Sequence, residues 1–91
     1  MKILWAQTAW DDYVSFQSTD KKAIKRINSL IKDIDRGGYE GIGKPEPLKY
    51  ELTGWWSRRI DSENRIVYRV VTDKTGFKTI EIAACKGHYA N

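Results

Sequence analysis

The sequence has few of the residues that build disulfides and metal sites, and no long apolar segment. It contains one cysteine and one histidine, which excludes an internal disulfide and leaves too few thiolate and imidazole ligands for a structural zinc site. No apolar run exceeds four residues, whereas a membrane helix needs about 20. The N-terminus also lacks the apolar core of a signal peptide. We therefore expect a cytoplasmic protein without a membrane segment, whose chemistry comes from ordinary side chains and needs no metal or cofactor.

The length of the chain limits its organisation. With 91 residues there is room for one compact domain, residues 1–91, which excludes a multidomain enzyme with a separate cofactor fold. The 16 Lys and Arg residues outnumber the 12 Asp and Glu residues and give a formal net charge of +4. This modest surplus suits an anionic partner but does not identify one.

The first part of the chain is typical of one strand and two helices. Residues 1–5 alternate like a short edge strand. Apolar residues at i, i+3 and i+4 from Trp10 onward predict a first helix. After a break at residues 18–20, isoleucines with a 3-4-3 spacing from Ile24 to Ile34 predict a second helix.

A loop rich in glycine and proline follows the second helix. Residues 37–47 contain four of the seven glycines and both prolines, so they form neither a helix nor a central strand. Glu46 lies between Pro45 and Pro47, and this position restricts its backbone to extended conformations. Such stiffening suits a side chain that must point in one direction.

Beyond the loop, the apolar period changes from about 3.6 to about two. Short turns separate four runs rich in β-branched and aromatic residues, which predicts antiparallel hairpins. The four runs are residues 48–53, 55–60, 65–72 and 77–85. The whole order predicts an α+β fold in which an N-terminal strand and two helices precede an antiparallel sheet, with both helices on one face.

The last hairpin predicts which residues meet across the sheet. A turn at residues 73–76 sets Thr72 opposite Phe77 and, counting back, Arg65 opposite Ala84. The start of one strand then meets the end of the next. The residues that follow this end include His88, which we expect near Arg65.

The preceding hairpin has two possible registers. A loop of four residues pairs Ile60 with Arg65, whereas a loop of five residues pairs Arg59 with Arg65. Only the second register places these two arginines side by side on one face. In both registers, Arg58 and Arg59 lie near the sheet edge where we also expect Tyr89.

This group of residues suits the cleavage of RNA through its own 2′-OH. The reaction needs a base for the 2′-OH, cations for the charge on the phosphorane and an acid for the leaving 5′-oxygen. The single histidine, His88, is the natural acid, because only histidine has an ordinary pKa near neutrality. The base must then be a carboxylate or a lysine, and Glu46 is the best-placed carboxylate. Arg59 and Arg65 would hold the phosphate.

Each of these residues also has a purely structural interpretation. His88 could be a solvated tail residue, and Glu46 a loop carboxylate. The arginines could be solvent-facing strand residues that protect the sheet from aggregation. A glutamate is also a weak base, so the mechanism requires a substrate that is already in line for attack. Cys85 has the character of a small buried apolar residue.

Six segments, in order along the chain, resemble the YoeB-type toxins of the RelE superfamily. They are WDDY at 10–13, KKAIKRINSLIKDI at 21–34, GIGKPEPLK at 41–49, LTGWWSRRI at 52–60, RIVY at 65–68 and ACKGHY at 84–89. Each segment alone is a weak signal, but six in the same order are a strong one. The resemblance implies the RelE-like fold, which is similar to that of microbial ribonucleases.

The resemblance also implies a function. The toxin of a type II toxin–antitoxin system would act as a metal-independent mRNA interferase, a ribosome-dependent endoribonuclease that cuts mRNA in the A site. The positions that match the family's general base, transition-state cation and general acid are Glu46, Arg65 and His88. Those that match its substrate-contacting residues are Lys49, Arg59 and Tyr89. The implied protein partners are a YefM-like antitoxin and a second copy of the toxin.

A second function remains open on the sequence. The related ParE-type toxins bind and inhibit DNA gyrase without cleaving RNA. The joint presence of Glu46, Arg65 and His88 argues against this alternative, since a pure binder does not need that set. The chain departs from the family pattern in a longer hairpin at residues 73–78 and in Ala90 and Asn91, which extend past Tyr89.

Overall fold

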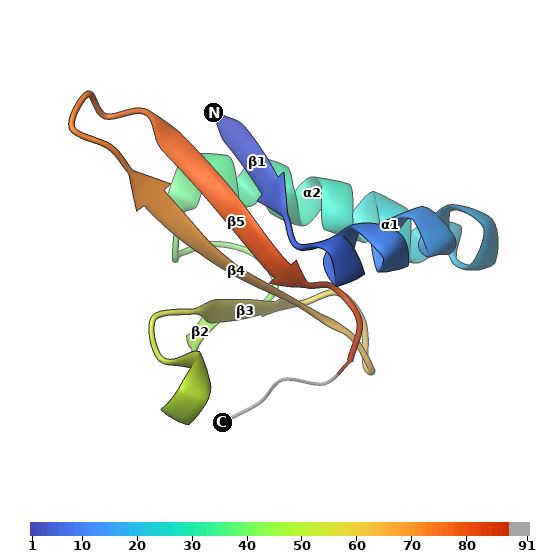
Figure 1. The fold of residues 1–91 in the computed structure, drawn as a ribbon. Coiled ribbons are helices and arrows are strands. Elements are labelled where there is room, and N and C mark those ends of the chain that lie inside the picture. Colours follow the sequence, from blue (N-terminus) through green and yellow to red (C-terminus); the bar gives the residue numbers. More distant parts are fainter. Residues whose placement is uncertain (88–91) are drawn as a thin grey trace.

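The computed structural model describes residues 1–87, so His88 and Tyr89 lie outside the described residues. Its strands form one mixed sheet in the order β1-β5-β4-β3-β2, in which β1 runs parallel to β5 and the other neighbours are antiparallel. The elements are β1 (Lys2–Trp5), α1 (Gln7–Thr19), α2 (Lys21–Gly37), β2 (Glu46–Pro47), a 3₁₀ turn (Tyr50–Leu52), β3 (Trp56–Arg59), β4 (Arg65–Thr72) and β5 (Lys78–Ala84). The predicted α+β fold class is confirmed, as is a strand and two helices before the remaining strands (Figure 1). The sheet is mixed, whereas the sequence predicted an antiparallel one.

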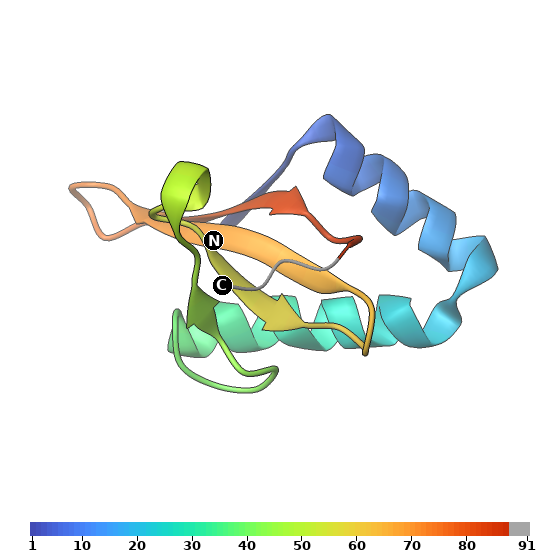
Figure 2. The same cartoon turned by 90° about the horizontal axis from the view of Figure 1, so that it is seen from below.

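Helix α2 lies across one face of the sheet (Figures 1 and 2). It begins where the Asp20 carboxylate accepts a hydrogen bond from the Ala23 N–H at 3.1 Å, and it ends at Gly38, whose φ of 63° favours glycine. Its apolar stripe, including Ile27 and Ile34, is buried. Helix α1 leaves the end of β1 and packs on α2 and β5. Within the part of the chain described, no helix is long and apolar enough to cross a membrane.

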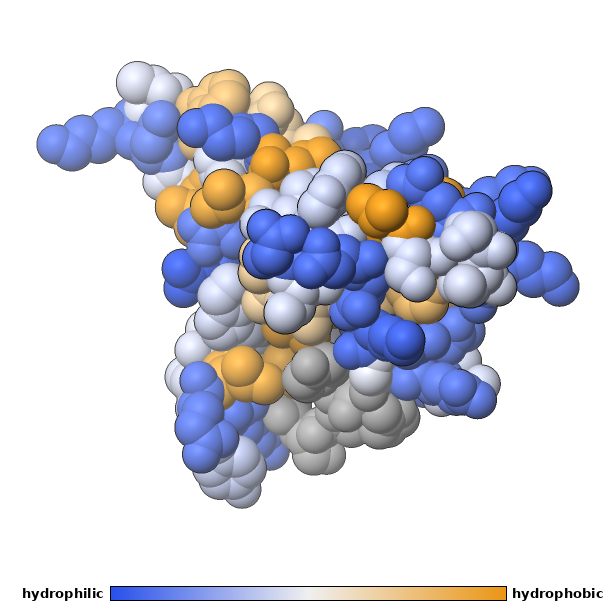
Figure 3. All heavy atoms as spheres, turned by 45° about the vertical axis from the view of Figure 1, so that its right-hand side comes forward, coloured by the Kyte–Doolittle hydropathy of each residue, from blue (hydrophilic) through white to orange (hydrophobic). Residues whose placement is uncertain are grey.

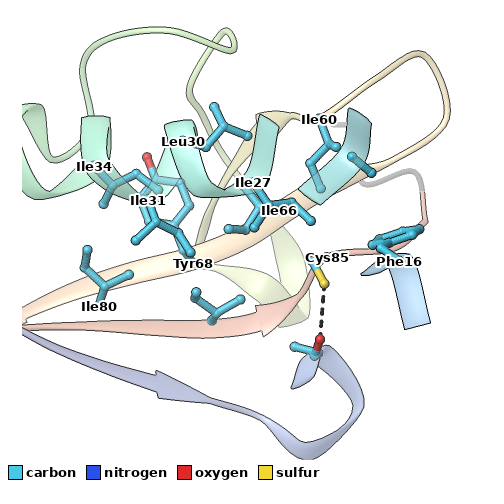
Figure 4. Packing of buried hydrophobic residues seen from close by; sticks show 13 residues of the cluster. Phe16, Ile27, Leu30, Ile31, Ile34, Ile60, Ile66, Tyr68, Ile80 and Cys85 are labelled. Carbon is cyan, nitrogen blue, oxygen red and sulfur yellow. Dashed lines mark hydrogen bonds between the residues drawn. The ribbon is translucent and has the colours of Figure 1, made fainter. Parts of the chain in front are cut away.

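One apolar core joins the two helices to strands β4 and β5 (Figure 4). The buried cluster includes Ala9, Phe16, Ala23, Ile27, Leu30, Ile31, Ile34, Ile60, Ile66, Tyr68, Ile80, Ile82 and Cys85. The Cys85 thiol donates to the Ala9 carbonyl at 3.2 Å, and burial raises its pKa to about 12. The interpretation of Cys85 as a small buried residue is therefore confirmed.

The register of the β4–β5 hairpin differs from the prediction. The Asp73 N–H donates to the Phe77 carbonyl, so the turn is one residue longer and Thr72 pairs with Lys78. A bulge between Val67 and Tyr68 then adds a further residue on β5. Arg65 consequently does not face Ala84, which pairs with Val67 instead. These shifts bring residues nearer to the C-terminus beside Arg65.

The strand predicted at residues 48–53 is wrong. Tyr50 has a φ of 59° and begins a 3₁₀ turn, and the Thr53 hydroxyl donates to the Tyr50 carbonyl at 2.7 Å. This local bonding replaces a strand ladder. The short edge strand β2, formed by Glu46 and Pro47, pairs with β3 in its place.

Arg58 is completely buried and holds the loop after α2. Its expected place at the functional edge of the sheet is therefore wrong, because its side chain points to the α2 face. Each of its five N–H groups donates one hydrogen bond. The acceptors are Tyr68 Oη (3.0 Å), Asp33 Oδ2 (2.6 Å) and the carbonyls of Gly38 (2.8 Å), Glu40 (2.9 Å) and Ile42 (3.1 Å). One guanidinium thus joins β3, β4, α2 and the loop.

Some apolar side chains also reach the surface. Figure 3 shows them as separate patches among hydrophilic residues on the side turned forward. The large exposed ones are Met1, Ile3, Leu4, Trp10, Val14, Ile42, Tyr50, Val71 and Phe77.

We predict that Arg58→Met lowers the free energy of unfolding by about 3–5 kcal/mol, because the Asp33 carboxylate and three loop carbonyls lose the hydrogen bonds that Arg58 donates to them. Urea denaturation measures the loss. The matched control is Arg36→Met, whose side chain is 79% exposed and pairs with Asp33 at 3.8 Å. This control should change stability by less than about 0.5 kcal/mol. Equal effects of the two substitutions would contradict the role of Arg58.

The Asp33 carboxylate should make folding stability depend on pH. Its hydrogen bond from Arg58 and then that from the Ile42 N–H hold the pKa of Asp33 below its ordinary value. Asp33 therefore adds to stability above the ordinary carboxyl pKa of about 3.9, and the contribution is lost as the pH falls toward the lowered pKa. We expect the stability difference between the wild type and Asp33→Asn to shrink from pH 7 to pH 3 in urea titrations. A constant difference would contradict this role.

Candidate active site

The candidate site lies on the face of the sheet that points away from α2. Because side chains alternate along a strand, the neighbours of the buried Arg58 point to this opposite face. Glu46 on β2 pairs with Ser57 on β3, and Ser57 pairs with Val67 on β4. One row of the open face therefore begins with the carboxylate of Glu46.

The next row along the strands contains two arginines. Arg59 pairs directly with Arg65, so the five-residue loop is the register that the structure adopts. Arg59 is exposed, whereas Arg65 is only 3% exposed. The structure thus brings Glu46, Arg59 and Arg65 together in one of the two registers that the sequence left open, and it gives the two arginines different surroundings.

The loop before β2 is tied to β3 at Gly43. The Arg59 N–H donates to the Gly43 carbonyl at 2.7 Å. Gly43 has a φ of 82°, and a Cβ atom there would lie 2.8 Å from Leu30 Cδ2 and 3.3 Å from the Arg59 carbonyl oxygen. Only glycine fits this close approach. The adjacent Lys44 has a φ of 51°, which turns its carbonyl toward the site.

Three acceptors and one carboxylate surround the Arg65 guanidinium. Its Nε donates to the Ser57 hydroxyl at 2.8 Å, and its Nη2 donates to the carbonyls of Lys44 at 3.0 Å and Ser57 at 3.3 Å. The same Nη2 lies 3.2 Å from Glu46 Oε1. Burial lowers the pKa of Arg65, the Glu46 charge opposes this shift, and the nearby Arg59 adds to it. Arg65 is therefore a cation in a fixed orientation at the floor of the site.

Of the remaining predicted residues, Lys49 is the one that lies within residues 1–87. Lys49 is exposed and directly precedes the 3₁₀ turn, three residues after Glu46. At the other end, the Arg65 N–H donates to the Gly87 carbonyl at 2.9 Å, and the Gly87 N–H donates to Asn64 Oδ1 at 2.9 Å. The chain is thus anchored beside Arg65 at the residue that precedes His88.

Ser57 is a site residue that the sequence analysis did not single out. It is buried, and both its hydroxyl and its carbonyl accept from Arg65. The alternation of side chains along a strand does place Ser57 on the same face as Arg59, two residues further along. A lone serine in a strand, however, is too common to suggest this role.

The arrangement combines a carboxylate, which can accept a proton, with a fixed positive charge beside it. The Glu46 side chain is 40% exposed, so a substrate can reach its carboxylate. The cation beside it is already oriented, and such preorganised charge stabilises a negative charge that develops during a reaction. Within residues 1–87, no three His, Cys, Asp or Glu side chains cluster in a way that could hold a metal ion.

Comparison with known proteins identifies the class. The fold is that of small bacterial toxins: the YoeB/ParE toxin from Agrobacterium tumefaciens superposes with a TM-score of 0.90 at 44% identity, over 98% of this chain and 100% of that one. A sequence model described as "YoeB-like toxin of bacterial type II toxin-antitoxin system" matches residues 5–89. The chain belongs to this YoeB family.

Individual relatives cover almost the whole chain. Toxin YoeB of Escherichia coli (strain K12) is 53% identical over 89 residues, which are 98% of this chain and 100% of the relative. A YoeB dimer from Staphylococcus aureus has a TM-score of 0.86 at 52% identity, over 98% of each chain. The toxin of a heterotetrameric YoeB–YefM toxin–antitoxin complex from the same organism has a TM-score of 0.83 at 51% identity, again over 98% of each chain.

We predict that Ser57→Ala destabilises the fold by about 1–3 kcal/mol, because the buried Arg65 Nε loses its hydroxyl acceptor. Chemical denaturation measures this change. Ser62→Ala, at an exposed serine in the loop between β3 and β4, is the matched control and should be close to neutral. If the two alanine variants were equally stable, the hydroxyl would not be needed to hold Arg65.

Proposed function

We propose that this YoeB-family toxin is a ribosome-dependent endoribonuclease that cuts mRNA in the A site. The observation that carries the proposal is the contact between a reachable carboxylate, Glu46, and a buried guanidinium, Arg65, at 3.2 Å on the open face of the sheet. A base and a cation at this separation fit a phosphodiester and the 2′-OH beside it. The match to the YoeB-like toxin family supports a toxin function.

In the proposed reaction, Glu46 takes the proton of the 2′-OH, and the resulting oxygen attacks the adjacent phosphorus. Arg65 stabilises the negative charge that develops on the phosphorane. The bond to the 5′-oxygen breaks, and His88 gives this oxygen a proton. The products are a 2′,3′-cyclic phosphate and a 5′-OH, so no water or metal ion enters the step.

The protein's contribution is largely positioning. Ser57 and the Lys44 carbonyl hold Arg65 before the substrate binds, so the cation need not reorganise during the reaction. Exposed Arg59 lies beside Arg65 and is free to adjust to a phosphate oxygen. We propose the same substrate contact for Lys49 and Tyr89. The ribosome would supply the in-line arrangement that a weak carboxylate base requires.

We also propose two protein partners. The Staphylococcus aureus relative forms a heterotetrameric complex with YefM and also a dimer. We infer that this chain binds a YefM-type antitoxin and pairs with a second copy of itself. In the complex of toxin and antitoxin, the substrate would not reach the open face of the sheet.

The test is cleavage of a defined message on purified ribosomes, followed by primer extension. Glu46→Gln and His88→Gln should each slow the cut by about 10²–10⁴-fold, as expected for loss of a general base or acid. The matched control is Glu51→Gln, which changes an exposed glutamate in the neighbouring 3₁₀ turn and should leave the rate unchanged.

Two outcomes would contradict the proposal. Full activity of both variants would remove Glu46 and His88 from the chemistry. Inhibition of purified gyrase in a supercoiling assay, without any message cleavage by the wild type, would favour the ParE-like alternative instead.

A further inference from the structure

A second row of side chains lies on the open face beside the candidate site. Trp55 lies two residues before Ser57, which corresponds to about 6.6 Å along the strand. Continuing the pairing of Trp56 with Tyr68 places Trp55 opposite Arg69, and Arg69 pairs with Glu81 on β5. This Trp55–Arg69–Glu81 row thus runs parallel to the row that starts at Glu46.

The three side chains form one preorganised unit. The Arg69 guanidinium carbon lies 4.4 Å from the centre of the Trp55 ring, and Arg69 Nε lies 2.6 Å from Glu81 Oε1. The Arg69 side chain is 44% exposed, so a surface ion pair of this kind adds little to stability. It does, however, hold a flat cation against a flat ring.

Packing in the hydrophobic core does not explain the tryptophan at position 55. The adjacent Trp56 stacks on Tyr39 at 4.6 Å and packs against the buried cluster. Trp55 points to the opposite face and contacts Arg69 there. A large aromatic ring on an open face, beside a candidate RNA-cleaving site, is suited to bind a ligand with a flat surface.

A hollow provides the space for such a ligand. It has a volume of ≈ 410 Å³ on this side of the sheet. Its lining residues are Leu4, Trp5, Ala6, Trp55, Glu81, Ile82 and Ala83. The walls are mostly apolar, and the single carboxylate among them is paired with Arg69. A nucleobase combines flat apolar faces with polar edges and fits these surroundings.

The position of the Trp55–Arg69–Glu81 row indicates which base of the RNA it would bind. The Glu46 row lies between the Trp55–Arg69–Glu81 row and the pair of Arg59 and Arg65. Phosphate charge belongs beside the arginines, and the 2′-OH belongs beside Glu46. The nucleotide that carries the 2′-OH therefore extends toward Trp55.

We propose that Trp55 and Arg69 form a stacking subsite for the base of the nucleotide that carries the attacking 2′-OH. This inference rests on the proposed function for the choice of nucleotide. Aromatic rings and arginine planes are the usual surfaces on which proteins stack unpaired RNA bases. Glu81 acts as a positioning residue, since it orients Arg69.

The experiment is a double-mutant cycle that needs no cleavage. Ribosomes carry a message with a 2′-O-methyl group at the attacking nucleotide, and a second message lacks the base at the same position. Titration with labelled toxin gives the dissociation constant for each. Trp55→Ala should weaken binding to the complete message about tenfold and leave binding to the abasic message unchanged. Trp55→Phe should retain most of the affinity.

The controls separate stacking from misfolding. Phe77→Ala removes an exposed aromatic ring from the turn between β4 and β5, outside the lining of the hollow, and should not affect either dissociation constant. Thermal unfolding of each variant verifies the fold. Arg69→Ala and Glu81→Gln should show the same dependence on the base as Trp55→Ala, with a smaller effect for Glu81→Gln.

The other possible outcomes each overturn or uphold the stacking subsite. Equal weakening of both messages by Trp55→Ala, or no weakening at all, would overturn the subsite. Loss of affinity for a YefM-type antitoxin with unchanged message binding would overturn it as well and assign the row to that partner. Base-dependent binding by a wild type that cleaves no unmodified message would uphold the subsite and overturn the proposed function.

Discussion

The rest of the structure depends on the buried guanidinium of Arg58. A charge without solvent must have a partner for every N–H group, and Arg58 obtains them from Asp33, Tyr68 and three loop carbonyls. The loop after α2 has little apolar material of its own, so this network gives it one conformation. The loop in turn brings the Lys44 carbonyl and the Glu46 carboxylate to Arg65 on the opposite face of the sheet.

Two adjacent arginines therefore have opposite tasks. Arg58 points to the helix and holds the scaffold, whereas Arg59 points to the open face beside Arg65. Strand β3 connects the two tasks rigidly, because a shift of one residue would exchange them. The same strand contributes Ser57, which orients Arg65. Stability and the candidate chemistry are thus encoded in alternate residues of one short strand.

Much of this arrangement was predictable, and the failures have physical causes. Periodicity located both helices, and the turn signals located β3, β4 and β5. Counting left two registers for the hairpin between β3 and β4, and the structure adopts the one that pairs Arg59 with Arg65. The segment at residues 48–53 was misassigned because a left-handed Tyr50 cannot be recognised from composition. The burial of Arg58 depends on an acceptor set assembled from residues far away in the chain. The alternation of apolar and polar residues also does not reveal the bulge between Val67 and Tyr68.

That bulge separates the two ends of the β4–β5 hairpin. On one side of it, Val67 pairs with Ala84 and the chain continues to the Gly87 carbonyl that meets Arg65. On the other side, the hairpin projects beyond the sheet to its turn (Figure 1). Residues added in pairs near the turn lengthen both strands equally and leave the pairing below the bulge unchanged. The hairpin is thus a part of the molecule that can vary in length during evolution without displacing the site.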